Sequence, residues 1–107
     1  MADFIEVRTT VERNEDAERI TRALVHQHLA ACVQVVGPIR STYWWKGEVE
    51  TADEFLILAK TRASLWSDVE RAIRSVHPYE TPEIAATTFA CISDDYERWL
   101  DAEIRKP

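Results

Sequence analysis

The segment His77-Pro78-Tyr79-Glu80-Thr81-Pro82-Glu83-Ile84 separates a helical pattern from a strand-like pattern and places several polar side chains on a stiff backbone. Proline fixes φ at about −65° and disfavours the helical conformation for the residue before it, so His77 and Thr81 are expected to be extended. The helix before this segment must therefore end at about residue 76. The histidine, tyrosine and glutamates of the segment are the first candidates for a binding site.

Regular patterns flank this segment on both sides. Residues 64–76 place apolar side chains at helical spacing, with Ser64 as the expected N-cap. Residues 83–91 are typical of a strand. Asp94 or Asp95 is expected to cap a short C-terminal helix.

The N-terminal half shows the same kinds of pattern. Residues 4–10 indicate a strand, and residues 15 to about 30 indicate an amphipathic helix with Asn14 as its N-cap. Residues 32–36 indicate a second strand, which we expect Gly37-Pro38 to break.

A long hairpin connects the two halves. Residues 39–46 and 48–60 have extended character, and Gly47 can supply the positive φ of the turn between them. The order is therefore β-α-β-β-α-β with a terminal helix, which is the pattern of a ferredoxin-like α+β sandwich. We expect one domain over residues 1–107, with both main helices on one face of an antiparallel sheet.

The hairpin carries the aromatic run Tyr43-Trp44-Trp45 just before its turn. Side chains alternate along a strand, so large rings are directed to both faces of a hairpin that helices can cover on one face only. Local packing with one exposed ring is one explanation. We favour burial against a neighbouring subunit, since monomers avoid large exposed apolar patches, and we predict a homo-oligomer.

Composition excludes several classes of partner. The formal net charge of −6 and the lack of a basic cluster argue against binding to nucleic acid or to an anionic membrane. No apolar run is long enough to span a bilayer, and the N-terminus lacks the pattern of a signal peptide. Cys32 and Cys91 show no CxxC spacing and are expected to be reduced thiols, so we expect a cytoplasmic protein.

The sequence contains no motif of an enzyme. It has no GxSxG elbow, and its two glycines, Gly37 and Gly47, cannot form a phosphate-binding loop. Acid–base catalysis by Tyr79, Glu80 and Glu83 is the weakest alternative, because no nucleophile or cofactor motif accompanies them.

Five segments together resemble the CutA-like divalent-cation tolerance proteins. They are Leu29-Ala30-Ala31-Cys32, residues 41–49 (STYWWKGEV), Lys60-Thr61-Arg62, His77 to Ile84, and Tyr96-x-x-Trp99-Leu100. The resemblance covers nearly the whole chain. It implies a ferredoxin-like subunit in a homotrimer with interlocking hairpins, a cytoplasmic role in tolerance of copper and other divalent metals, and no catalytic reaction.

The resemblance also implies a metal site, of which this chain has only a part. Metal-binding relatives have a cysteine near the end of the first strand and a pair of histidines before the proline; Arg8 and Val76 stand at two of these positions, and only His77 transfers. His77 is the best candidate ligand for copper or another divalent cation, because neutral imidazole binds such ions. Glu80 and Glu83 are candidate oxygen ligands. The alternative is that all three side chains hold the turn by hydrogen bonds.

Two functions from different classes follow. The first is a non-enzymatic, metal-binding homotrimer of divalent-ion tolerance. The second is a trimeric signalling or scaffold module that binds a small anionic metabolite or a protein partner between subunits. In the second case Arg8, Arg40, Lys60 and Arg62 would attract the anion.

Overall fold

The sheet of this chain has four strands in the order β2-β3-β1-β4, and all neighbouring pairs are antiparallel. The computed structural model describes residues 4–107. The elements in chain order are β1 (Phe4–Val11), α1 (Asn14–Val25), β2 (Cys32–Trp45), β3 (Glu48–Arg62), the 3-10 turn η1 (Ala63–Leu65), α2 (Trp66–Val76), β4 (Ala85–Thr88) and α3 (Asp94–Glu103). This topology confirms the predicted ferredoxin-like α+β fold.

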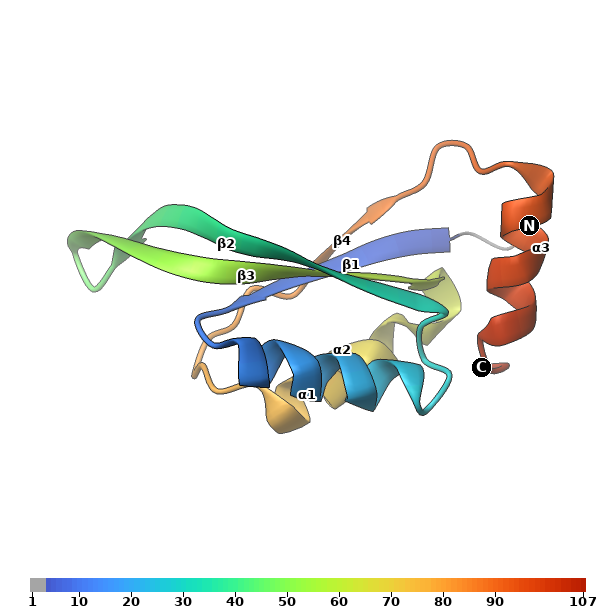
Figure 1. Ribbon diagram of the computed structural model, residues 1–107, viewed down its shortest axis with the longest axis horizontal. Helices are drawn as coiled ribbons and strands as arrows, with labels where there is room; N and C mark the ends of the chain where they lie inside the picture. Colours follow the sequence, from blue (N-terminus) through green and yellow to red (C-terminus); the bar gives the residue numbers. More distant parts are fainter. Residues whose placement is uncertain (1–3) are drawn as a thin grey trace.

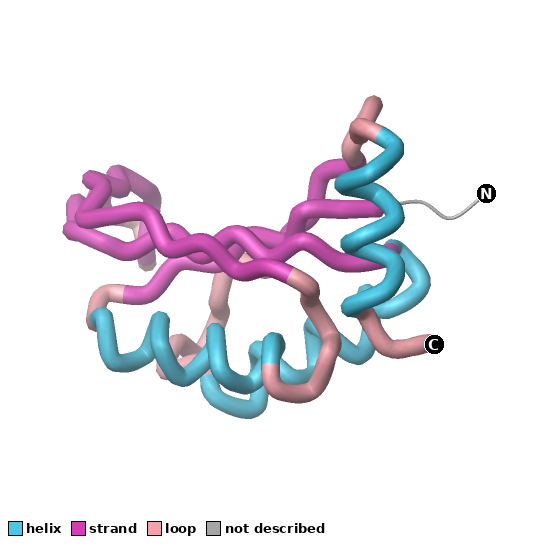
Figure 2. Tube along the Cα trace, turned by 45° about the vertical axis from the view of Figure 1, so that its right-hand side comes forward, coloured by secondary structure: helices cyan, strands magenta, loops and turns pink. Residues whose placement is uncertain are grey.

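Helices α1 and α2 cover one face of the sheet, while α3 stands across the end of the sheet at which β1 begins (Figures 1 and 2). The β2–β3 hairpin extends beyond the helices at the other end (Figure 1). No helix within residues 4–107 has both the length and the apolar character needed to cross a membrane.

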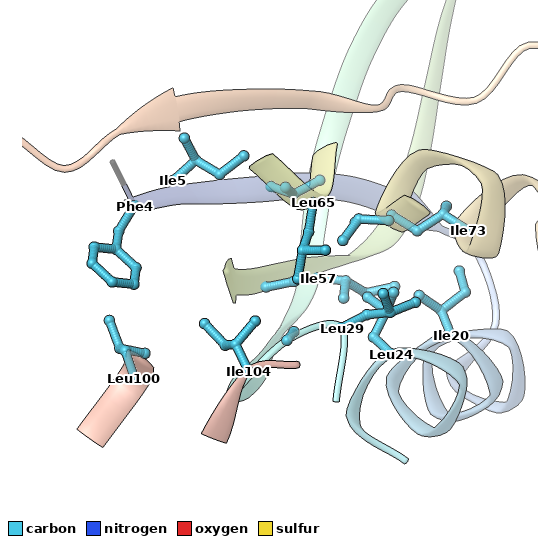
Figure 3. Packing of buried hydrophobic residues seen from close by; sticks show 14 of the residues in the cluster. Phe4, Ile5, Ile20, Leu24, Leu29, Ile57, Leu65, Ile73, Leu100 and Ile104 are labelled. Atoms are coloured by element: carbon cyan, nitrogen blue, oxygen red, sulfur yellow. The ribbon is translucent and has the colours of Figure 1, made fainter. Parts of the chain in front are cut away.

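The core lies between the sheet and the two covering helices. Buried side chains come from α1 and α2 at helical spacing and from alternate positions of the strands, as their periodicity predicts. Figure 3 shows a second part of the same cluster, in which Phe4 at the start of β1 is directed toward Leu100 and Ile104. The largest fully buried apolar side chains are Ile20, Leu24, Leu29, Ile57, Leu65, Ile73 and Leu100.

Helix α1 ends at Val25, about five residues before the end that its apolar spacing predicts. The reason is His28, whose φ of 55° lies in the left-handed region that glycine usually occupies at a helix end. The backbone N–H of Leu29 donates to the carbonyl of Leu24 (2.9 Å), and that of His28 donates to Val25 (3.0 Å). This is a Schellman termination with buried Leu24 and Leu29 in the positions that usually contact each other.

The prediction that Gly37-Pro38 breaks a strand is wrong. β2 continues from Cys32 to Trp45 through a bulge, because Val36 pairs with Leu56 and Ile39 pairs with Glu54. Two residues of β2 thus lie opposite one residue of β3, as in a β-bulge. A Cβ on Gly37 would lie 2.6 Å from Cδ1 of Phe55, so glycine is required by close packing at this position.

The predicted N-caps also differ from the structure, which shows no side-chain capping bond at α1, α2 or α3. Asn14 is the first residue of α1, Ser64 lies in the 3-10 turn before α2, and Asp94 begins α3 after Ser93. β4 has four residues, far fewer than the predicted 83–91, because only Ala85–Thr88 pair with β1. Boundaries of this kind depend on tertiary pairing more than on local pattern.

The hairpin turn forms as predicted. Trp45 pairs with Glu48, and the two turn residues Lys46 and Gly47 have φ values of 51° and 81°. Two consecutive positive φ values are typical of a type I′ turn, whose twist matches that of the flanking strands. The turn therefore closes the β2–β3 ladder directly beside the aromatic residues.

Candidate functional site

A cavity of about 730 Å³ lies between the outer half of the hairpin and the segment from Tyr79 to Glu83. Carboxylates, hydroxyls and aromatic rings make up most of its wall. The lining residues are Thr10, Glu12, Ser41, Thr42, Tyr43, Trp44, Trp45, Glu54, Tyr79, Glu80, Thr81 and Glu83. The stiff segment identified in the sequence thus forms one wall of this cavity.

His77 lies beside this cavity, and both of its ring nitrogens are engaged within the chain. The backbone N–H of Tyr79 donates to Nδ1 (3.1 Å), while Nε2 lies 3.0 Å from the carbonyl oxygen of Thr10 and 3.0 Å from Oγ1 of Thr9. A carbonyl oxygen only accepts, so Nε2 carries the proton and Nδ1 carries the lone pair. The imidazole therefore fastens the segment to β1.

Burial lowers the pKa of His77 below its ordinary value, since a half-buried imidazolium loses hydration. The hydrogen bond to Thr10 and the charges of Asp16 and Glu54 act in the opposite direction, and Arg74 reinforces the lowering. The folded chain thus favours neutral His77.

A pH-dependent stability should follow from His77. Below about pH 6.5, the ordinary histidine pKa, the unfolded chain takes up a proton that the folded chain takes up only at lower pH, so acid should destabilise the fold. Urea unfolding between about pH 8 and 5 tests this in the wild type and in His77→Gln. The difference in free energy of unfolding between the wild type and the variant should become smaller as the pH falls. A difference that does not change with pH would contradict the prediction. His26 and His28 are present in both proteins, so the comparison isolates the effect of residue 77.

Glu54 is the site residue that the sequence analysis missed. It lies on β3, is only 5% exposed, and accepts a hydrogen bond from the hydroxyl of Tyr79 (2.7 Å). Within residues 4–107 no lysine or arginine forms an ion pair with it. Burial, and then the adjoining Glu54, raise the pKa of Tyr79 well above its ordinary value. The sequence signal that points to Glu54 is its position two residues before Leu56 and four before Leu58, which places it on the same face of a strand.

The structure places the three predicted metal ligands in two different settings. Glu80 and Glu83 are exposed on the cavity wall, whereas the imidazole of His77 is directed to β1. In the described part of the chain no three His, Cys, Asp or Glu side chains are grouped as a metal ion would require. A site built from His77, Glu80 and Glu83 stays a prediction.

The basic side chains considered for an anionic ligand are also in different settings. Arg62 is buried and bonded to Asp101, and Lys60 contacts Gln34 and lies 4.0 Å from Glu6. Arg8 has a buried Nε without a hydrogen-bond partner among the described residues. Arg40 is exposed and forms no ion pair among the described residues, so Arg8 is the cation of this set that has a buried atom without a hydrogen-bond partner.

Comparisons with known proteins agree with the fold and with the motifs. Residues 5–103 match the family model described as CutA1 divalent ion tolerance protein. The divalent-cation tolerance protein CutA of Archaeoglobus fulgidus is 36% identical over 97% of this chain and 99% of its own. That of Pyrococcus horikoshii is 34% identical over 96% of this chain and 100% of its own.

A solved structure gives the same result. The crystal structure of CutA1 from Oryza sativa superimposes with a TM-score of 0.94 at 34% identity, covering 98% of this chain and 96% of that one. The similarity thus extends over the sheet, the helices and the hairpin.

Proposed function

Because the chain belongs to the CutA1 divalent ion tolerance family, we propose that it is a non-enzymatic, cytoplasmic protein of divalent-cation tolerance that binds copper or a similar ion as a homotrimer. The proposal has two parts, self-association and metal binding. They rest on different residues and are tested separately.

Exposed aromatic residues on the hairpin support self-association. Trp44 is 75% exposed, and Tyr43, Trp45 and Val49 beside it are also exposed. These side chains lie on strands that extend past the covering helices (Figure 1), so α1 and α2 do not cover them. Closed cyclic symmetry would cover the same patch on every subunit. This patch is the observation that carries the proposal.

The donor set of the subunit supports weak rather than tight metal binding. Glu80 and Glu83 have carboxylates without an ion pair in the described chain and can donate oxygen. His77 could bind a metal only by giving up its bond from Tyr79 or its bonds to β1. Arg8, at the position of the relatives' cysteine, cannot donate a lone pair. A complete site therefore needs donors from more than one subunit.

Copper titration of the assembled protein tests this part. Replacing both Glu80 and Glu83 by glutamine should weaken copper binding about tenfold or more, because two anionic donors are lost. His77→Ala should weaken copper binding as well. His26 is an exposed histidine at the end of α1, outside the cavity wall, so His26→Ala should leave copper binding unchanged. Binding should decrease in acid, since ligands must be deprotonated. Equal affinity in all four proteins would remove this segment from the metal site.

The second candidate function is a trimeric module that binds an anionic metabolite between subunits. The buried, unpartnered Nε of Arg8 favours it, because an oxyanion would supply the missing acceptor. Thermal stabilisation by an organic acid or nucleotide, absent in Arg8→Met and not reproduced by copper, would favour this function over the first.

A further inference from the structure

We draw no further inference here: the strongest candidate, the free outer edges of the sheet at β2 and at β4, belongs to the self-association proposed above, and nothing among residues 4–107 shows what else covers those edges.

Discussion

Glutamate in place of Trp44 should separate the proposed trimer into monomers at micromolar concentration. Trp44 is the most exposed large apolar side chain of the hairpin, and it pairs across the ladder with Val49, which is also exposed. Loss of a tryptophan at the centre of an interface commonly costs about 3 kcal/mol, which corresponds to a hundredfold or so in affinity. A carboxylate buried there without a partner adds to this cost.

Sedimentation velocity and native mass spectrometry at several chain concentrations would measure the change. Trp99→Glu is the matched control, because Trp99 is also an exposed ring but lies on α3, stacked on Tyr96. Both variants should keep the wild-type circular dichroism, since neither ring belongs to the buried cluster. A wild-type chain that is monomeric at these concentrations would refute self-association, and equal dissociation by Trp99→Glu would show that the hairpin is not the specific contact.

The fold was predictable from sequence because local pattern and topology agree along most of the chain. Buried Ile20 and Leu24 follow the 3.6-residue period of α1, and Gly47 marks the one turn that needs positive φ between two long strands. The short connections between successive elements then favour the observed strand order over other topologies.

The misjudged details depend on contacts between distant residues. Nothing in the local pattern shows that His28 takes the left-handed position that ends α1, because glycine is the usual signal there. Gly37-Pro38 resembles a strand break, and only the pairing with β3 makes it a bulge opposite Phe55.

The candidate site was also predictable only where it depends on local sequence. The stiffness of the segment after His77 was predictable from its prolines, and the structure does place this segment on the cavity wall. The partners of His77 on β1 and the bond between Tyr79 and Glu54 join residues at least 25 positions apart, so no local spacing indicates them. The spacing of Glu54 with Leu56 and Leu58 is only a weak signal, because the charged residues Glu50 and Lys60 lie at the same alternate positions of β3.

Arg62 is the side chain that attaches the C-terminal helix to the sheet. Its guanidinium is buried at the end of β3, and it donates to Oδ1 of Asp101 (2.6 Å), the carbonyl of Asp101 (3.3 Å) and the carbonyl of Arg105 (2.9 Å). A second link runs from Nδ1 of His28 to the carbonyl of Glu103 (2.8 Å), and the backbone N–H of Arg105 donates to His28 (2.8 Å). These bonds hold α3 where its apolar residues reach the core.

Arg62→Met should therefore destabilise the protein by about 2–4 kcal/mol, because it removes the charge-assisted bonds that a buried guanidinium makes to α3 and to the residues after it. Leu100 and Ile104, which lie against Phe4 in Figure 3, should lose part of their protection from solvent. Urea unfolding at one fixed chain concentration measures the free energy, and hydrogen exchange of residues 94–104 localises the change.

Two further variants separate the geometry of the guanidinium from its charge. Arg62→Lys keeps the charge but cannot reach three acceptors with a planar fork, so it should recover only part of the stability. Arg98→Met removes an exposed arginine from α3 itself and should change the free energy of unfolding by less than about 0.5 kcal/mol. If Arg62→Met were as mild as Arg98→Met, the apolar contacts of Leu100 and Ile104 alone would hold α3, and Arg62 would have only a minor part in its attachment. Full stability in Arg62→Lys would instead mean that a point charge beside Asp101 is sufficient and that the bonds to the two carbonyl groups contribute little.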